Sequence, residues 1–332
     1  MIRIKSLPFI GFGILLLALG AFLSLSYGAR SVPFETVMDS LLLLDQDSLE
    51  AIVVKERIPR TIFGLIAGAS LGVSGAIMQA ITRNPIADPS ILGVNTGASL
   101  FVVAGITFFS IGSLNEYIWF ALLGAMITSI VVYTIGSLGY GGATPIKLAL
   151  AGVATSAALS SFVSALVLPR TDVMNTFRFW QVGSISGATW EGIVAIFPYI
   201  LIGLVIAIAV APSLEAMALG DELATGLGVR TSVIRMIGAF SGIVLCGATT
   251  ALAGPIGFIG LMVPHAVRLL FGPGILKNLP LSAIGGAVLL LLSDVLGRLI
   301  GSPAELETGI VTAFLGAPIL IIIAMKARVN EL

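Results

Sequence analysis

The chain has 332 residues, of which 57% are apolar even before its 39 glycines are counted. It carries 17 basic and 17 acidic residues, so charged residues make up 10% of the chain, against about 25% in soluble domains. This composition excludes a soluble globular enzyme. The net charge is zero and the basic residues are scattered, so the sequence shows no basic patch that could bind nucleic acid. The sequence therefore predicts an integral membrane protein.

Cysteine and histidine are almost absent. Cys246 is the only cysteine and His265 the only histidine, which excludes an intrachain disulfide and the usual thiolate or histidine-pair metal sites. No Gly-Lys dipeptide occurs, so the chain lacks the phosphate-binding loop G-x-x-x-x-G-K-[ST]. We therefore expect no metal site and no ATP-binding loop in this chain.

Ten apolar runs follow one another, and most approach the roughly 20 residues that a membrane-crossing helix needs. They cover residues 7–27, 61–81, 91–109, 117–137, 146–167, 190–211, 232–252, 256–271, 280–300 and 308–325. The first run follows basic residues, as in a secretory signal, but it exceeds the apolar core of about 7–15 residues that such signals have. We interpret it as a span. The fold class is thus an all-α membrane protein of about ten helices, with residues 1–332 as one transmembrane domain.

The charged connecting segments predict an orientation. With both termini in the cytoplasm, ten of the 17 basic residues lie in cytoplasmic segments, as the positive-inside rule favours. Residues 28–57, the most charged stretch, are then expected to form an external loop, and residues 212–231 a cytoplasmic one.

The second of these loops contains a candidate docking helix. Asp221 and Glu222 suit its first turn, where the helix dipole favours acids, and Gly226 or Gly228 suits its end. A short exposed helix between two spans can dock a cytosolic partner, and an ordinary surface turn is the alternative interpretation.

Polar side chains inside the spans mark cavities or partner helices, because they are costly in lipid. Asp294 is the one carboxylate well inside a run, and we interpret it as one half of a structural ion pair, with a proton relay as the alternative. The fifth run carries hydroxyls that either line a wet pathway or bond back to their own helix: Thr155, Ser156, Ser160, Ser161 and Ser164.

Two further patterns concern helix packing. A stripe of glycines at Gly64, Gly68, Gly72 and Gly75 predicts closely approaching helices. The pattern Gly75-Ala76 with Asn84-Pro85-Ile86 is echoed by Gly247-Ala248 with Gly254-Pro255-Ile256. An inverted repeat of two five-helix halves would produce this echo, and chance similarity is the alternative.

A series of motifs, in order from about residue 55 to the C-terminus, resembles those of the FecCD-type permeases. These are the membrane subunits of ABC importers for iron chelates, haem and vitamin B12. The motifs are Arg57-Ile-Pro-Arg60, Gly75-Ala-Ile-Met-Gln-Ala80, Asn84-Pro-Ile-Ala-Asp-Pro89, Leu92-Gly93, Trp180-Gln-Val-Gly-Ser184, Gly220-Asp-Glu-Leu-Ala224, Leu227-Gly228, Gly254-Pro-Ile-Gly-Phe-Ile-Gly-Leu261, Val263-Pro-His265, Pro303-Ala-Glu-Leu306 and Gly316-Ala-Pro318.

The resemblance implies a vitamin B12 permease-like fold whose pathway lies between two permease subunits, identical or paralogous. It implies two copies of a cytosolic ABC ATPase, which bind ATP and Mg, and an extracytoplasmic substrate-binding protein. The chain itself would be no enzyme, have no catalytic residue, bind no cofactor and no nucleic acid, and lie in the bacterial cytoplasmic membrane as a multi-pass protein.

The resemblance also implies site residues. Those that match the ATPase-coupling segment are Gly220, Asp221, Glu222, Ala224, Leu227 and Gly228. Those that match outer-face arginines for binding-protein docking are Arg57, Arg60 and Arg298, and those that match a cytoplasmic gate are Asn84 and Ile86. One departure is Glu307, an acid where B12-type sequences are apolar, which we expect to lie near Arg298 and to screen it.

The expected function is a permease subunit that carries a ferric siderophore, driven by ATP hydrolysis in a separate subunit. Haem or vitamin B12 is the alternative within the family. The spans hold one histidine, one cysteine and no paired acids, which agrees with an intact chelate crossing through a cavity lined in part by Thr155, Ser156, Ser160 and Ser164. From other classes, the alternatives are an ion-gradient-driven transporter with Asp294 as coupling acid, and an intramembrane enzyme.

Overall fold

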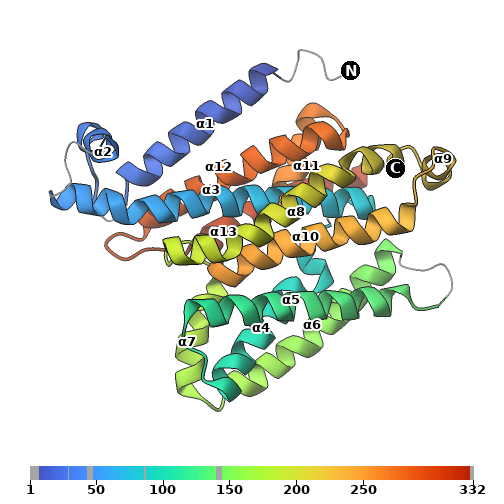
Figure 1. The fold of residues 1–332 in the computed structure, drawn as a ribbon, viewed down its shortest axis with the longest axis horizontal. Coiled ribbons are helices and arrows are strands. Elements are labelled where there is room, and N and C mark those ends of the chain that lie inside the picture. The colour runs from blue at the N-terminus through green and yellow to red at the C-terminus, as the bar shows by residue number, and fades with distance from the viewer. Residues whose placement is uncertain (1–6, 29, 43–47, 86, 140–143, 330–332) are drawn as a thin grey trace.

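The computed structural model describes residues 7–28, 30–42, 48–85, 87–139 and 144–329. Regular structure in these residues is helical (Figure 1). In chain order the helices are α1 (Leu7–Ser26), α2 (Phe34–Leu41), α3 (Leu49–Thr82), the 3-10 helix η1 (Pro89–Leu92), α4 (Val94–Ala104), the π-helical turn η2 (Gly105–Phe109), α5 (Leu114–Ser137), α6 (Pro145–Val167), α7 (Thr171–Val182), α8 (Trp190–Met217), α9 (Asp221–Gly226), α10 (Thr231–Ala253), α11 (Ile259–Phe271), α12 (Ile275–Ile300) and α13 (Thr308–Val329).

Ten of these segments match the ten predicted spans. Six helices among the described residues are long and apolar enough to cross a membrane, namely α3, α5, α6, α8, α10 and α12. Four shorter apolar helices, in α1, α4 with η2, α11 and α13, account for the other runs. The predicted all-α membrane fold is therefore confirmed.

Helix α3 lies at the centre of the molecule. It packs against α1, α8, α10, α11 and α12, while α4, α5 and α6 form a separate group at the bottom of Figure 1. Helix α10 joins the two groups because it contacts both α3 and α5. One continuous apolar core runs through this arrangement, from Phe63 in α3 to Ile118 in α5 and Leu245 in α10.

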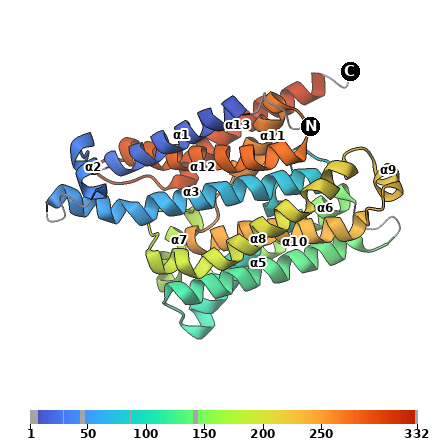
Figure 2. The same ribbon diagram turned by 45° about the horizontal axis from the view of Figure 1, so that its top comes forward.

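The two ends of the bundle carry different short helices. Helix α9 lies at one end, called here the α9 end, and α13 runs toward it (Figures 1 and 2). Helices α2 and α7 and the start of α3 lie at the opposite end, called here the α2 end. Candidate functional residues at the two ends therefore face opposite sides of a membrane that the bundle crosses.

The glycine stripe on α3 lets neighbouring backbones touch. A Cβ added at Gly72 would lie 2.1 Å from the carbonyl oxygen of Ser282 on α12, and one added at Gly75 would lie 1.7 Å from that of Gly260 on α11. Such distances leave no room for a side chain, so the predicted close packing is confirmed.

The predicted external loop at residues 28–57 is wrong in extent. It contains α2, and α3 already begins at Leu49, where Ser48 caps the helix by accepting a hydrogen bond from the Ala51 amide at 3.1 Å. Helix α3 then continues through Pro59. The part of α3 before residue 61 could not be predicted, because it contains charged residues and a proline, and hydropathy detects only the part of a helix that lies in lipid.

The predicted cytoplasmic loop at 212–231 is also shorter than expected. Helix α8 continues through Pro212 to Met217, so that α9 and short turns make up the remainder. Helix α7 was not predicted, because its 12 residues include charged side chains and form no apolar run.

The two echoing segments occupy equivalent places in the fold. Each lies at the end of a long helix, α3 or α10, and leads through a Pro-Ile pair toward a short helix, α4 or α11. Interrupted helices at matching positions are what inverted repeats produce. The repeat itself stays a prediction.

Candidate functional site

Helix α9 forms at the place where the sequence predicts a docking helix. It spans Asp221–Gly226, with both acids in its first turn. It ends in a Schellman motif, in which the Val229 amide donates to the Ala224 carbonyl at 3.0 Å and the Gly228 amide to that of Thr225 at 2.9 Å. This motif needs a positive φ at Gly228, which has 87°, so glycine is required there for backbone reasons.

The side chains of α9 divide into an inner and an outer set. Ala224 is fully buried, whereas Glu222 is exposed and the exposed fractions of Leu223 and Leu227 are 61% and 68%. Two exposed leucines beside an acid on a projecting helix form a surface suited to a protein partner. Of the predicted coupling residues, Glu222 and Leu227 lie on this surface.

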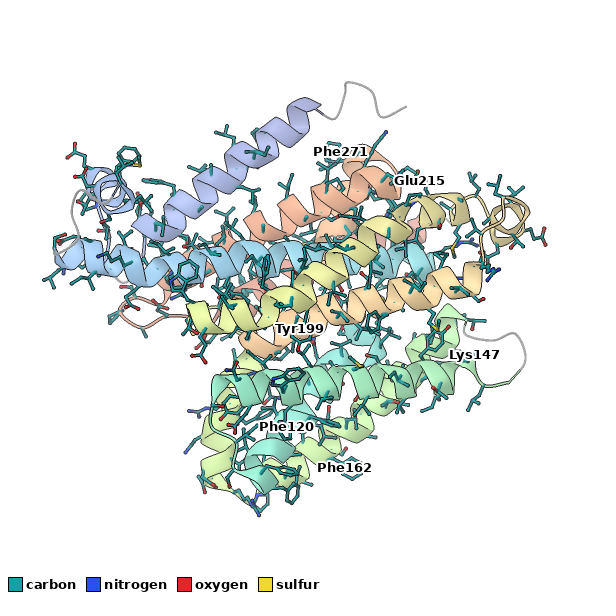
Figure 3. All side chains as sticks on the ribbon, viewed as in Figure 1. Phe120, Lys147, Phe162, Tyr199, Glu215 and Phe271 are labelled. Atoms are coloured by element: carbon teal, nitrogen blue, oxygen red, sulfur yellow. The ribbon has the colours of Figure 1, made fainter. Side chains whose placement is uncertain are left out.

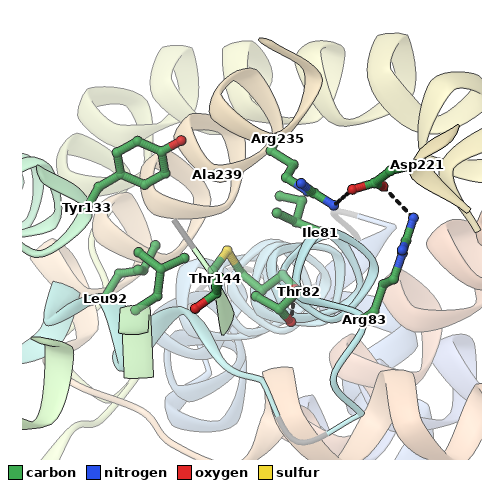
Figure 4. A pocket seen from close by; sticks show the side chains of 11 residues that line it. Ile81, Thr82, Arg83, Leu92, Tyr133, Thr144, Asp221, Arg235 and Ala239 are labelled. Atoms are coloured by element: carbon green, nitrogen blue, oxygen red, sulfur yellow. Dashed lines mark hydrogen bonds and ion pairs between the residues drawn. The ribbon is translucent and has the colours of Figure 1, made fainter. Parts of the chain in front are cut away.

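Asp221 points away from this surface. Its carboxylate pairs with Arg83 at 2.5 Å and with Arg235 at 2.7 Å (Figure 4). Arg83 caps the end of α3 and also donates to the Met217 carbonyl at the end of α8. Asp221, Arg83 and Arg235 border a cavity of about 330 Å³, which is also lined by residues of η1, α5 and α6. Asp221 thus positions α9 against the bundle.

The predicted gate follows this contact directly. Asn84 is half-buried and comes next after Arg83 in the chain. Ile86 lies outside the described residues. The gate assignment stays a prediction, but its first residue adjoins the arginine that holds α9.

At the α2 end, the predicted docking arginines come together with two acids. Arg60 forms a bidentate contact with Asp294, from Nε to Oδ2 at 3.0 Å and from Nη2 to Oδ1 at 2.7 Å, and its Nη1 pairs with Glu305 at 2.7 Å. Arg57 donates instead to two backbone carbonyls, those of Leu25 at 2.7 Å and Arg30 at 2.6 Å.

Arg298 is not at the surface where the sequence places it. Its side chain is only 1% exposed, and it pairs at 3.0 Å with Asp294, whose side chain is fully buried. Its Nη1 donates to the Ser24 carbonyl at 2.9 Å, and Thr308 donates to Asp294 at 3.0 Å. This conformation leaves Arg298 no open side for a partner. The structural ion pair predicted for Asp294 is confirmed.

The hydroxyl stripe on α6 faces outward from the chain. Only 11% of the most apolar stretch of α6 is buried, against 78% in α3. Ser160 and Ser164 are exposed, Ser164 bonds back to the Ser160 carbonyl at 3.0 Å, and Ser156 contacts Thr96 at 3.0 Å. Thr155 is half-buried. The face is open to a second subunit or to lipid, and the pathway role stays a prediction.

An apolar cavity lies between α4, α5 and α6. Its volume is about 580 Å³, and Phe120 on α5 and Phe162 on α6 are among the residues that line it. Figure 3 shows these two rings in the lower group of helices, whereas Lys147 and Glu215 lie toward the α9 end. The residues that line the cavity are apolar and belong to α4, η2, α5 and α6, and the hydroxyl residues of the stripe are not among them.

Among the described residues, no three His, Cys, Asp or Glu side chains cluster as metal ligands would. Cys246 is buried in α10 and His265 is half-buried in α11. Three charged residues of the contacts described above were not among the predicted site residues: Arg83, Arg235 and Glu305. The sequence signal for Glu305 was its place in the Pro303–Leu306 motif, and the arginines had none beyond their charge.

Comparison with known proteins identifies the family. Residues 16–326 match the model of the FecCD transport family. The chain is 41% identical to the ferric enterobactin transport system permease protein FepD of Escherichia coli (strain K12), over 94% of this chain and 93% of the relative. It is 42% identical to the Fe(3+)-citrate import system permease protein YfmD of Bacillus subtilis (strain 168), over 93% and 92%.

It is also 33% identical to the hemin transport system permease protein HmuU of Yersinia pestis, over 98% of both chains. Among solved structures, an inward-facing conformation described as a metal-chelate type ABC transporter aligns with a TM-score of 0.81 and 29% identity, over 96% of this chain and 99% of that one. The chain therefore belongs to the FecCD transport family, whose members are membrane-spanning permease subunits of ABC transporters.

Proposed function

We propose that this chain is the permease subunit of an ABC importer that carries a ferric siderophore across the bacterial cytoplasmic membrane. The observation that carries the proposal is its 41–42% identity, over more than nine-tenths of its length, to permeases for ferric enterobactin and Fe(3+)-citrate. The absence of a clustered metal-ligand set in the described chain agrees with a cargo that crosses as an intact chelate.

The α9 end is the cytoplasmic side in this proposal. An exposed helix with Leu223 and Leu227 on its surface offers a docking element to a separate ATPase, which binds ATP and Mg, whereas this chain binds no cofactor. Both termini are then cytoplasmic, and the α2 end with Arg57 and Arg60 faces the substrate-binding protein.

The working assembly contains two permease subunits, two ATPase subunits and one substrate-binding protein. The open face of α6 supports a second permease, identical or paralogous, because its hydroxyls would then enclose a pathway between the subunits. Haem is the alternative cargo, supported by the hemin relative at 33% identity. Asp294 is held by two arginines, so no observation favours a gradient-driven transporter.

Uptake of labelled iron chelates tests this function. Cells that carry or lack the chain are given ferric enterobactin, ferric citrate, a ferric hydroxamate, haem and cobalamin in parallel. We expect loss of one ferric siderophore without the chain, and loss on ATP depletion but not on collapse of the proton gradient. If only haem uptake or only cobalamin uptake is lost, that compound is the cargo in place of a ferric siderophore. Uptake that depends on the proton gradient would contradict the ABC mechanism.

Leu227→Arg should uncouple transport from ATP hydrolysis. A charged side chain on the exposed apolar surface of α9 disrupts docking without touching the core, since Leu227 is 68% exposed. We expect chelate transported per ATP hydrolysed to fall about tenfold or more, in line with the cost of a mismatched charge in an interface. Leu42→Arg is the control, because Leu42 is 61% exposed at the opposite end. Equal ratios in the two variants would contradict the docking role.

A further inference from the structure

The charges at the α2 end are arranged in an inner and an outer layer. Asp294 is the inner acid: its side chain is fully buried, and it holds both Arg60 and Arg298. Glu305 is the outer acid: it is 36% exposed and touches Arg60 through Nη1 alone, at 2.7 Å. Arg60, itself 11% exposed, therefore has one side fixed in the protein and one edge directed at the surface.

The two contacts of Arg60 differ in how readily they exchange. The contact with Asp294 is bidentate and dry, and breaking it would leave uncompensated buried charge. The contact with Glu305 is single and reachable by water, and such pairs contribute little net free energy. Glu305 also lies on the segment between α12 and α13, where residues 302–306 are all exposed. An arriving carboxylate would therefore displace Glu305 and leave Asp294 in place.

We propose that Glu305 is an internal stand-in for the acidic side chain of a docking protein. It occupies the outer edge of Arg60 while no partner is present, and it gives way when a partner carboxylate takes that edge. This inference rests on the proposed function, in which the substrate-binding protein docks at the α2 end. Arg57 supports the same partner chemistry, because its guanidinium bonds only to backbone carbonyls among its described contacts and adds positive charge beside Arg60.

This assignment changes which residues face the partner. Arg298 is buried behind Asp294, so it acts as a positioning residue for the network. Glu307, which the sequence suggested as the screening acid, is half-buried and forms no ion pair among the described residues; its carbonyl accepts the Ile310 amide at 3.0 Å at the start of α13. Glu305 and Glu307 therefore form a matched pair of acids, two residues apart, of which only one contacts Arg60.

The test measures binding of the substrate-binding protein that restores chelate uptake with this permease. The purified permease–ATPase complex is titrated with that protein at low and high salt. We expect Glu305→Gln to tighten binding about tenfold at low salt, because it frees the Arg60 edge and removes repulsion between two carboxylates. Glu307→Gln removes the same charge from the same segment and should change binding less than about twofold.

Two further results decide the matter. Arg60→Gln should abolish the gain made by Glu305→Gln, since the gain acts through that guanidinium. Unchanged or weaker binding by Glu305→Gln, or equal tightening by Glu307→Gln, overturns the inference while the proposed function stands. Failure of the unsubstituted complex to bind any such protein overturns the proposed function, and the inference with it.

Discussion

Asp294→Asn is expected to lower the free energy of unfolding by about 3–5 kcal/mol, the usual cost of removing one partner from a buried charge cluster. The carboxylate is fully buried between Arg60 and Arg298, so an amide leaves two guanidinium groups without their counter-charge. Thermal unfolding in detergent should show a drop in Tm on the order of 10 °C.

Two further variants test whether Asp294 stabilises the fold or takes part in transport. Asp294→Leu with both Arg60→Met and Arg298→Met should recover much of the stability, because well-packed apolar side chains then replace the whole buried charge cluster at little cost. Glu305→Gln should change the free energy of unfolding by less than about 1 kcal/mol, since that pair is partly exposed. An Asp294→Asn protein that stays stable but no longer transports would instead support the role of Asp294 as a coupling acid.

Gly75→Ala should lower the free energy of unfolding by a similar amount, because it disturbs helix packing. The added Cβ would lie 1.7 Å from the Gly260 carbonyl oxygen and 2.5 Å from its Cα. Because these are backbone atoms, no side-chain rotation relieves the clash, and α3 must separate from α11. We expect a loss of about 3 kcal/mol or more in stability, at or above the upper end of overpacking effects, measured in the same thermal assay.

Gly11→Ala is the matched control for this substitution. Gly11 lies on α1, and an added Cβ there meets nothing within 4 Å. The same chemical change should therefore leave Tm unchanged or raise it, since alanine favours helix over glycine by about 1 kcal/mol. Equal losses at Gly11 and Gly75 would mean that close helix approach is not the cause.

Much of the candidate coupling site could be predicted because its signals are local. Two acids at the start of α9 and a glycine after its end follow from the dipole and from the φ that a Schellman motif requires. The inward turn of Asp221 could not be predicted, because its partners Arg83 and Arg235 come from α3 and α10. Adjacent acids on one helix look alike in the sequence, whether they meet a partner protein or their own bundle.

The sequence by itself determined the all-α membrane class, the ten spans and the opposite placement of the charged segments. This is possible because the lipid thickness sets the length of each apolar run, and the cost of charge in lipid keeps charged residues between the runs. Only the tertiary structure decided which charges are open to a partner. Arg60 and Asp294 are 234 residues apart, and their pairing exists only once α3 and α12 lie side by side. Arg298 and Asp294 share α12, but the contact of Arg298 with Ser24 forms only where α1 packs against that helix. Hydropathy places a charge near a span end, and neighbouring helices then determine whether it meets water or a counter-charge.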